Sequence, residues 1–154
     1  MSLDVTLDDG VELPAVMRRR LVSCVRRMVR AAARTEELPG FEVGLRLTTD
    51  AEIHALNRTY RAKNKPTDVL AFAQREGPAG RLHPELLGDI VISVETARRQ
   101  AKRGLYAELV HLASHGLCHL LGYDHRDDEE ERVMNARAAA LRKEGARTGR
   151  VRPA

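Results

Sequence analysis

The chain has 154 residues, of which 43% are hydrophobic and 31% are charged, a balance that is typical of a folded globular domain and excludes wholesale disorder. The formal net charge of +4 favours a polyanionic partner such as nucleic acid, although arginines spread over a solvated surface would give the same charge. Two cysteines are too few for a disulfide framework, and no apolar run approaches the roughly 20 residues of a membrane span. We therefore expect a cytoplasmic protein without a membrane partner.

The first third of the chain alternates between predicted strands and helices. Residues 3–7 and 41–47 alternate apolar and polar side chains, as half-buried strands do. Between them, apolar residues recur at helical spacing after Pro14, from Val16 to Ala32, which predicts a helix. Asp50 is expected to cap a short helix that ends near Leu56.

The rest of the chain predicts two more strands and three more helices. Residues 68–73 and 88–94 are the strands, separated by a glycine-rich loop at 77–80. Helical patterns follow at 95–103, 105–121 and 127–143, and acidic residues crowd the start of the last one, where the helix dipole favours them. Asp89 interrupts an apolar strand, so we expect it to accept structural hydrogen bonds, with a position facing a pocket as the alternative.

These elements predict an α/β (α+β) fold because strands and helices interleave without a linker or a repeat. We expect a single domain over residues 1–154, built on one mixed four-stranded sheet with helices packed on it. Residues 145–154 are expected to form a flexible basic tail.

The most informative stretch is HGLCHLLGYDH, residues 115–125. His115 and His119 are four residues apart, so on a helix both imidazoles project from one face and can reach one ion. Gly122 suits a left-handed helix end, after which the chain can bring His125 back over that end. Three neutral nitrogen ligands with a fourth position open predict a catalytic, zinc-like site at the end of a core helix.

Two neighbouring residues are further candidates for metal ligands. His111 shares the helical face, but it lies about 12 Å along the axis from His119 at 1.5 Å per residue, too far to share one ion easily. Cys118 points about 100° away from His119, so a small buried apolar role is favoured.

The spacing also matches the extended zinc-protease signature in all but one residue. Those proteases place a glutamate after the first histidine as the general base, whereas this chain has Gly116 there. Peptide hydrolysis is therefore disfavoured, while a metal could still acidify water or polarise a phosphoryl oxygen.

Three blocks of this sequence resemble the YbeY family of bacterial rRNA-maturation endoribonucleases. Residues 115–125 resemble its H-G-x-x-H-x-x-G-Y-D-H signature. LNRTYR at 56–61 with KPTDVL at 65–70 resembles a second block, and LGDIVIS at 87–93 a third, and their order and spacing agree as well.

The resemblance implies a zinc-dependent, single-strand-specific endoribonuclease with one ion per chain held by His115, His119 and His125. It also implies that the protein processes 16S rRNA, especially its 3′ end, and that it takes part in ribosome quality control. The expected partners are rRNA, the small ribosomal subunit, ribosomal proteins and an assembly GTPase. Arg61 matches the family arginine that contacts the RNA phosphate. Asp124 is a candidate for orienting a ligand imidazole, for acid or base catalysis, or for stabilising a turn.

Two other functions remain open from the sequence. One is a non-catalytic ribosome-assembly factor in which the metal only holds the fold. The other is a different metallohydrolase, a protease or a phosphoesterase.

Overall fold

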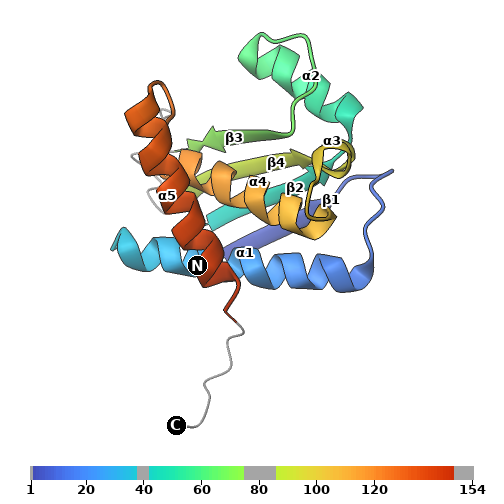
Figure 1. Ribbon diagram of the computed structural model, residues 1–154. Helices are drawn as coiled ribbons and strands as arrows, with labels where there is room; N and C mark the ends of the chain where they lie inside the picture. The colour runs from blue at the N-terminus through green and yellow to red at the C-terminus, as the bar shows by residue number, and fades with distance from the viewer. Residues whose placement is uncertain (1, 38–41, 75–85, 148–154) are drawn as a thin grey trace.

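The computed structural model describes residues 2–37, 42–74 and 86–147, and strands and helices alternate along them (Figure 1). In chain order the elements are β1 (Ser2–Leu7), α1 (Ala15–Thr35), β2 (Glu42–Thr48), α2 (Asp50–Arg61), β3 (Val69–Ala73), β4 (Leu86–Ser93), α3 (Val94–Gln100), α4 (Leu105–Leu120) and α5 (Asp128–Gly145). The predicted loop at 77–80 and residues 148–154 of the predicted tail lie outside the described residues. None of the described helices is long and apolar enough to cross a membrane.

The strands form one mixed sheet in the order β1-β2-β4-β3. β1 pairs with β2 and β2 with β4 in parallel, whereas β3 runs antiparallel to β4. Parallel neighbours need a crossover between them, which α1 supplies from β1 to β2. The predicted α+β class and the mixed four-stranded sheet are thereby confirmed.

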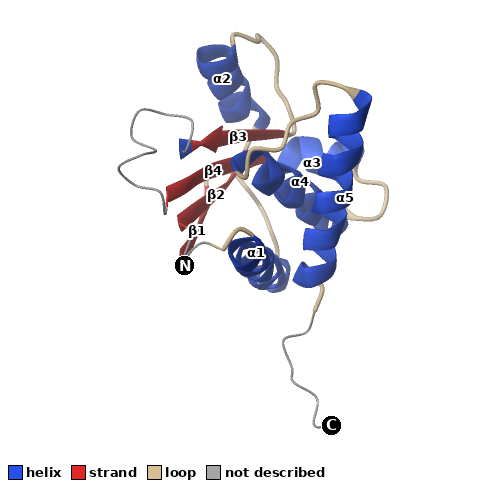
Figure 2. Cartoon of the chain, turned by 90° about the vertical axis from the view of Figure 1, so that its left-hand side faces the viewer, coloured by secondary structure: helices blue, strands red, loops and turns tan. Residues whose placement is uncertain are grey.

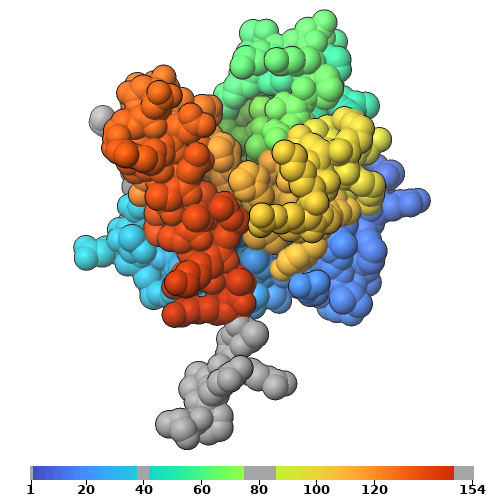
Figure 3. Space-filling model, viewed as in Figure 1, coloured from blue at the N-terminus to red at the C-terminus, as the bar shows by residue number. Residues whose placement is uncertain are grey.

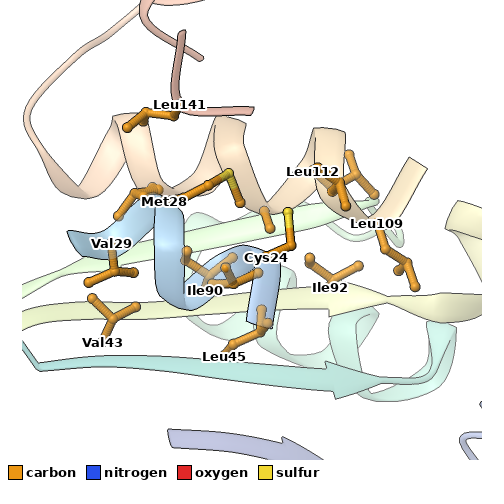
Figure 4. Packing of buried hydrophobic residues seen from close by; sticks show 14 of the residues in the cluster. Cys24, Met28, Val29, Val43, Leu45, Ile90, Ile92, Leu109, Leu112 and Leu141 are labelled. Atoms are coloured by element: carbon orange, nitrogen blue, oxygen red, sulfur yellow. The ribbon is translucent and has the colours of Figure 1, made fainter. Parts of the chain in front are cut away.

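Helices α1, α4 and α5 cover one face of the sheet and enclose the core (Figure 2). Alternate residues of β2 and β4 point to this face, and they include Val43, Leu45, Ile90 and Ile92, each at most 3% exposed. Figure 4 shows these side chains packed against Met28 of α1 and residues of α4 and α5. The apolar side chains that alternate along the strands therefore pack against those that recur at helical spacing along α1 and α4, and together they form one apolar layer.

The opposite face of the sheet is only partly covered. Helix α2 packs over its β3–β4 end through Ile53, Leu70 and Val91. Beside this patch Asp89 is exposed, and within the described residues its carboxylate accepts no hydrogen bond. Desolvation by the sheet, with the charge of Asp4, raises the pKa of Asp89. The predicted role as a structural acceptor is therefore wrong, because the strand turns Asp89 away from the core. The alternative, a position facing a pocket, is confirmed, since Asp89 lines a cavity on this face of the sheet.

Helix α2 differs from the sequence prediction at both ends. Its N-cap is Thr49, whose Oγ1 accepts from the Glu52 amide at 3.4 Å, and the helix continues to Arg61 instead of ending near Leu56. Asp50 is instead the first helical residue. Its Oδ1 accepts from Thr96 Oγ1 at 2.5 Å and its Oδ2 from Arg99 Nη1 at 2.7 Å, which ties α2 to α3.

Asp50→Asn tests this tie between the helices. Burial alone would raise the pKa of Asp50, but hydrogen bonds from Arg99, Ser93 and Thr96 outweigh burial and hold it at about 2, below the usual 3.8. The substitution is expected to lower the free energy of unfolding by about 2 kcal/mol near neutral pH. Because the folded pKa is depressed, this contribution is complete above the usual value and is lost as pH falls towards the folded value. Urea unfolding of both proteins across that range measures it, and a difference that stays constant with pH would contradict it.

Candidate metal centre

The histidine motif lies on the last turns of α4, a helix fixed by burial on most of its sides. Leu109, Leu112, Leu117 and Leu120 are each at most 3% exposed, against the sheet and the neighbouring helices. The face of α4 that these leucines leave free carries His115 and His119, which are half-buried. The apolar residues therefore determine the direction in which both imidazoles point.

The end of α4 brings the third histidine to the first two. The Tyr123 amide donates to the Cys118 carbonyl and the Gly122 amide to the His119 carbonyl, both at 3.0 Å, which is the Schellman pattern of helix termination. Gly122 has a backbone φ of +99°, a value that residues with a side chain rarely adopt, so glycine is needed here. Tyr123 packs against the core. The predicted helix end at Gly122 and its reversal towards His125 are confirmed.

The three histidines lie around one point in space. Ligand atoms of His115, His119 and His125 are all within 4.8 Å of one another, and the ring centroids are 5.1, 5.2 and 6.0 Å apart. Nitrogens around a tetrahedral zinc ion are about 3.3 Å apart, a spacing that small side-chain rotations can reach. The group therefore has the composition and the position to hold a metal ion.

The protonation of the group also suits a metal. Burial, and then the neighbouring His119, His111 and His125, lower the pKa of His115 from 6.5 to about 4. His115 is therefore neutral at physiological pH, and a metal binds the neutral imidazole.

A cavity of about 480 Å³ opens beside the three histidines. Its opposite wall is the segment from the end of α2 to β3, which contributes Arg61, Lys63 and Lys65. His125 is half exposed at this site. A ligand can therefore reach the open side of the histidine group, and that approach is lined by cations.

Arg61 lines the cavity from the last turn of α2. One Nη2 hydrogen bond to the Ala71 carbonyl, at 2.7 Å, anchors it to β3, and its guanidinium lies 5.0 Å from the centre of the Phe72 ring. The side chain is otherwise exposed, so most of its N–H donors remain available. Its assignment to catalysis stays a prediction.

Asn57 is a positioning residue that sequence reasoning missed. It is 3% exposed, and its Nδ2 donates to the Lys65 carbonyl at 2.9 Å. This bond, with the left-handed Ala62 at the end of α2, holds the basic segment over the cavity. Asn57 follows Ile53 by four residues, so a polar side chain on the buried face of the helix was the available signal.

Asp124 shapes the turn that carries His125. Its Oδ1 accepts from the His125 amide at 2.8 Å, and this bond, with the nearby Arg126 and the histidines, outweighs desolvation and lowers the pKa of Asp124. The carboxylate is therefore ionised at neutral pH, a state that can accept a proton but cannot donate one. The catalytic role of Asp124 stays a prediction. The role that the structure shows is the hydrogen bond that stabilises the turn before His125.

The two other residues weighed in the motif lie outside the histidine group. Cys118 is fully buried, and burial raises its thiol pKa to about 11, so the expected core role is confirmed. His111 is exposed one turn before His115, with the ring centroids 6.3 Å apart, and it is not a member of the group.

Comparison with known proteins agrees with the motif. Residues 9–145 match the profile of the family described as Endoribonuclease YbeY. The chain belongs to this family. The Endoribonuclease YbeY of a Geobacillus species is 42% identical over 136 residues, covering 82% of this chain and 87% of that relative. That of a Picosynechococcus species is 52% identical over 109 residues, covering 66% and 67%.

Other matches cover less of the relative or show the fold alone. The Endoribonuclease YbeY of Trichormus variabilis is 54% identical over 99 residues, which are 59% of this chain and 56% of that relative. The solution structure of a Thermotoga maritima protein has a TM-score of 0.59 at 23% identity and covers 94% of this chain and 89% of its own. The family resemblance of the three sequence blocks is thereby confirmed.

The surroundings of Gly116 explain why the glutamate of the zinc-protease signature cannot stand at this position of the chain. It is buried where α4 crosses β4, and a Cβ there would lie 2.7 Å from Cγ2 of Ile90. A side chain at this position would enter the helix–sheet contact and would not face the histidine group.

Gly116→Ala is therefore expected to destabilise the protein, although alanine favours helices. Overpacking of a buried contact costs about 1–3 kcal/mol, and over most of that range the roughly 0.8–1.0 kcal/mol gained in helix propensity offsets only part of the cost. Thermal unfolding measures the difference. Gly122→Ala serves as a comparison, because that Cβ would meet nothing within 4 Å and only backbone strain acts there. An unchanged or raised melting temperature for Gly116→Ala would contradict the packing explanation.

Proposed function

We propose that this protein is a zinc-dependent, single-strand-specific endoribonuclease that matures the 3′ end of 16S rRNA and takes part in ribosome quality control. The observation that carries the proposal is a group of three histidines that opens to a cation-lined cavity. Membership of the YbeY family and the name Endoribonuclease YbeY of its relatives support RNA as the substrate.

His115, His119 and His125 would hold the ion. When bound, zinc would act as a Lewis acid that lowers the pKa of water and stabilises negative charge on a phosphate. The donor set fits, because all three residues offer imidazole nitrogens and His115 is neutral at physiological pH.

Arg61 would bind the phosphate at the cleavage site. Its contacts with the Ala71 carbonyl and the Phe72 ring fix the guanidinium plane, so little side-chain entropy is lost when a phosphate binds. The remaining donors can form paired hydrogen bonds to two phosphate oxygens and stabilise the charge of the transition state. Lys63 and Lys65 on the same wall add positive charge but no fixed geometry.

Asp124 would hold His125 in place and accept a proton. Its Oδ1 lies 3.9 Å from His125 Nδ1 and accepts from the His125 amide, so the carboxylate restrains the one histidine that lies beyond the helix. Its lowered pKa keeps the carboxylate ionised at neutral pH, which is the form that can accept a proton.

Family membership also supports the cellular setting. We propose that the protein acts in the cytoplasm on the small ribosomal subunit, with ribosomal proteins and an assembly GTPase as partners. The formal net charge of +4 suits such an RNA-rich environment.

The two alternative functions require features that this site lacks. A non-catalytic assembly factor needs an enclosed structural ion, and the half-exposed His125 at an open cavity disfavours that. A protease needs a general base, and Gly116 leaves its usual position empty of any side chain.

Metal content and RNA cleavage test the proposal together. The wild-type protein is expected to carry about one zinc per chain by mass spectrometry and to cut a single-stranded rRNA fragment. His119→Ala should lose both properties, because two imidazoles bind zinc far more weakly than three. His111→Ala is the matched control for metal content, since it removes an imidazole from the same helical face outside the group.

Each failure has a separate meaning. Bound zinc with intact RNA would support the assembly factor, and cleavage of a peptide or a small phosphoester alone would support another metallohydrolase. Carefully prepared wild-type protein without metal would overturn the proposed centre.

Arg61 is expected to act on the chemical step and not on the metal. Arg61→Gln should lower kcat for RNA cleavage by about 10²–10³-fold, the usual effect of removing one donor to a transition-state oxyanion. Arg61→Lys should recover part of this activity, because it restores charge without the paired donors. Zinc content should not change. Arg58→Gln, on the same helix and outside the cavity lining, is the matched control. Equal kcat for the Arg58 and Arg61 variants would contradict the assignment.

A further inference from the structure

A second and larger cavity lies next to the metal centre. It is a groove of about 1160 Å³ between α1, the α3–α4 segment, α4 and the end of α5. These elements meet on the face shown in Figure 3, and α5 lies in front of α4 in the view of Figure 1. The groove contains none of the three histidines of the metal centre, and the proposed cleavage chemistry assigns no role to it.

The groove is lined by cations that have no acidic partner. They come from α1, the α3–α4 segment and α5: Arg19, Arg20, Arg27, Lys102, Arg103 and Arg142. Within the described part of the chain, none of the six lies within 4.0 Å of a carboxylate, whereas Arg46, Arg99 and Arg126 all do. The carboxylates of the lining are Asp68 and Glu108, and the Gln100 amide donates to both at one end. The remainder of the groove therefore keeps an uncompensated positive charge.

The groove continues into the metal cavity. His111 and Asp68 line both spaces. On α4 the residues at four-residue spacing, from Ala107 through His111 to His115, form one row at about 6 Å per step. An extended chain that passes the histidine group can therefore follow α4 towards its N-terminus and enter the groove.

We propose that this groove binds the backbone phosphates of single-stranded RNA on one side of the cleaved bond. The inference rests on the proposed function, because it takes RNA as the ligand of the adjoining metal cavity. Guanidinium and ammonium groups without a carboxylate partner along an open groove match a polyanion. Their position next to Arg61, Lys63 and Lys65 gives one strand cations on both sides of the metal centre.

The lining favours phosphate contacts over base recognition. Tyr106 is the aromatic residue of the groove, and the guanidinium of Arg20 covers its ring at 4.2 Å from the centroid. Arg20 covers one face of that ring, and Tyr106 also packs against the core, so the ring is a poor platform for a stacked base. Binding in the groove should accordingly depend on strand length and salt and only weakly on sequence.

Three of the cations can be changed without loosening the fold. Arg27 donates to the Gly145 carbonyl at 2.8 Å and Arg142 to Ser114 Oγ at 2.9 Å, so both also join helices. Arg19, Lys102 and Arg103 are exposed. The test variant is therefore Arg19→Gln with Lys102→Gln and Arg103→Gln.

The matched control removes the same charge elsewhere. It combines Arg18→Gln, Arg30→Gln and Lys143→Gln, which are exposed residues of α1 and α5 outside the groove lining. Thermal unfolding should show both triple variants to be as stable as the wild type.

Binding is measured by fluorescence anisotropy in EDTA, so that the RNA stays intact. The probe is a single-stranded RNA of about 12 nucleotides, within the roughly 4–16 that such sites cover. The groove variant should bind about tenfold more weakly than the control variant near physiological salt. Its plot of log affinity against log salt should be shallower by about 0.7 for each phosphate that the protein no longer neutralises. A dinucleotide, which reaches only the metal cavity, should not distinguish the variants.

The outcomes separate this inference from the proposed function. Equal affinity and equal salt dependence of the two triple variants would overturn the groove site, even if the zinc-loaded wild type cleaves RNA. Weaker binding by the groove variant alone would support the site, even if the zinc-loaded wild type leaves the RNA intact. A wild type that does not bind the longer RNA at low salt would overturn the groove site as well.

Discussion

The contact between α4 and β4 is the constraint on which the site depends. Gly116 brings the helix backbone close to Ile90, and the leucines of α4 fill the space around that contact. With three sides of the helix buried, only the remaining side can carry polar groups, and that side holds His115 and His119. The same packing that excludes a catalytic glutamate at position 116 therefore aims both imidazoles at the cavity. Stability and metal-site geometry share one cause in this helix.

The charges around the site follow a simple arrangement. The centre is a set of imidazoles, of which His115 is kept neutral by burial and by its neighbours. Cations lie on both sides of it, on the segment after α2 and along the groove beside α4. Most acidic residues near the site are engaged in turns and caps, as Asp124 and Asp127 are. A group of histidines between two basic surfaces suits a long polyanion better than a small neutral substrate.

The wall opposite the histidines depends on polar contacts, of which one is distant in the sequence and two are nearer. Helix α2 is held to α3 by Asp50 and to β3 by Arg61. Its buried Asn57 fixes the carbonyl of Lys65 in the following segment. Polar bonds of this kind make the wall a defined surface, which is what a phosphate-binding arginine needs in order to keep its donors oriented.

Local spacing along the chain was enough to predict the strands, the long helices and the histidine site. The offsets between His115, His119, Gly122 and His125 placed one site at one helix end, because turns and helix faces are set within a few residues. Packing between distant segments, in contrast, set the partners of Asp50, the outward position of Asp89 and the groove shared by α1, α4 and α5. Each of these depends on segments that lie apart in the sequence and meet only when the sheet and its helices have packed, and no local pattern encodes such a meeting.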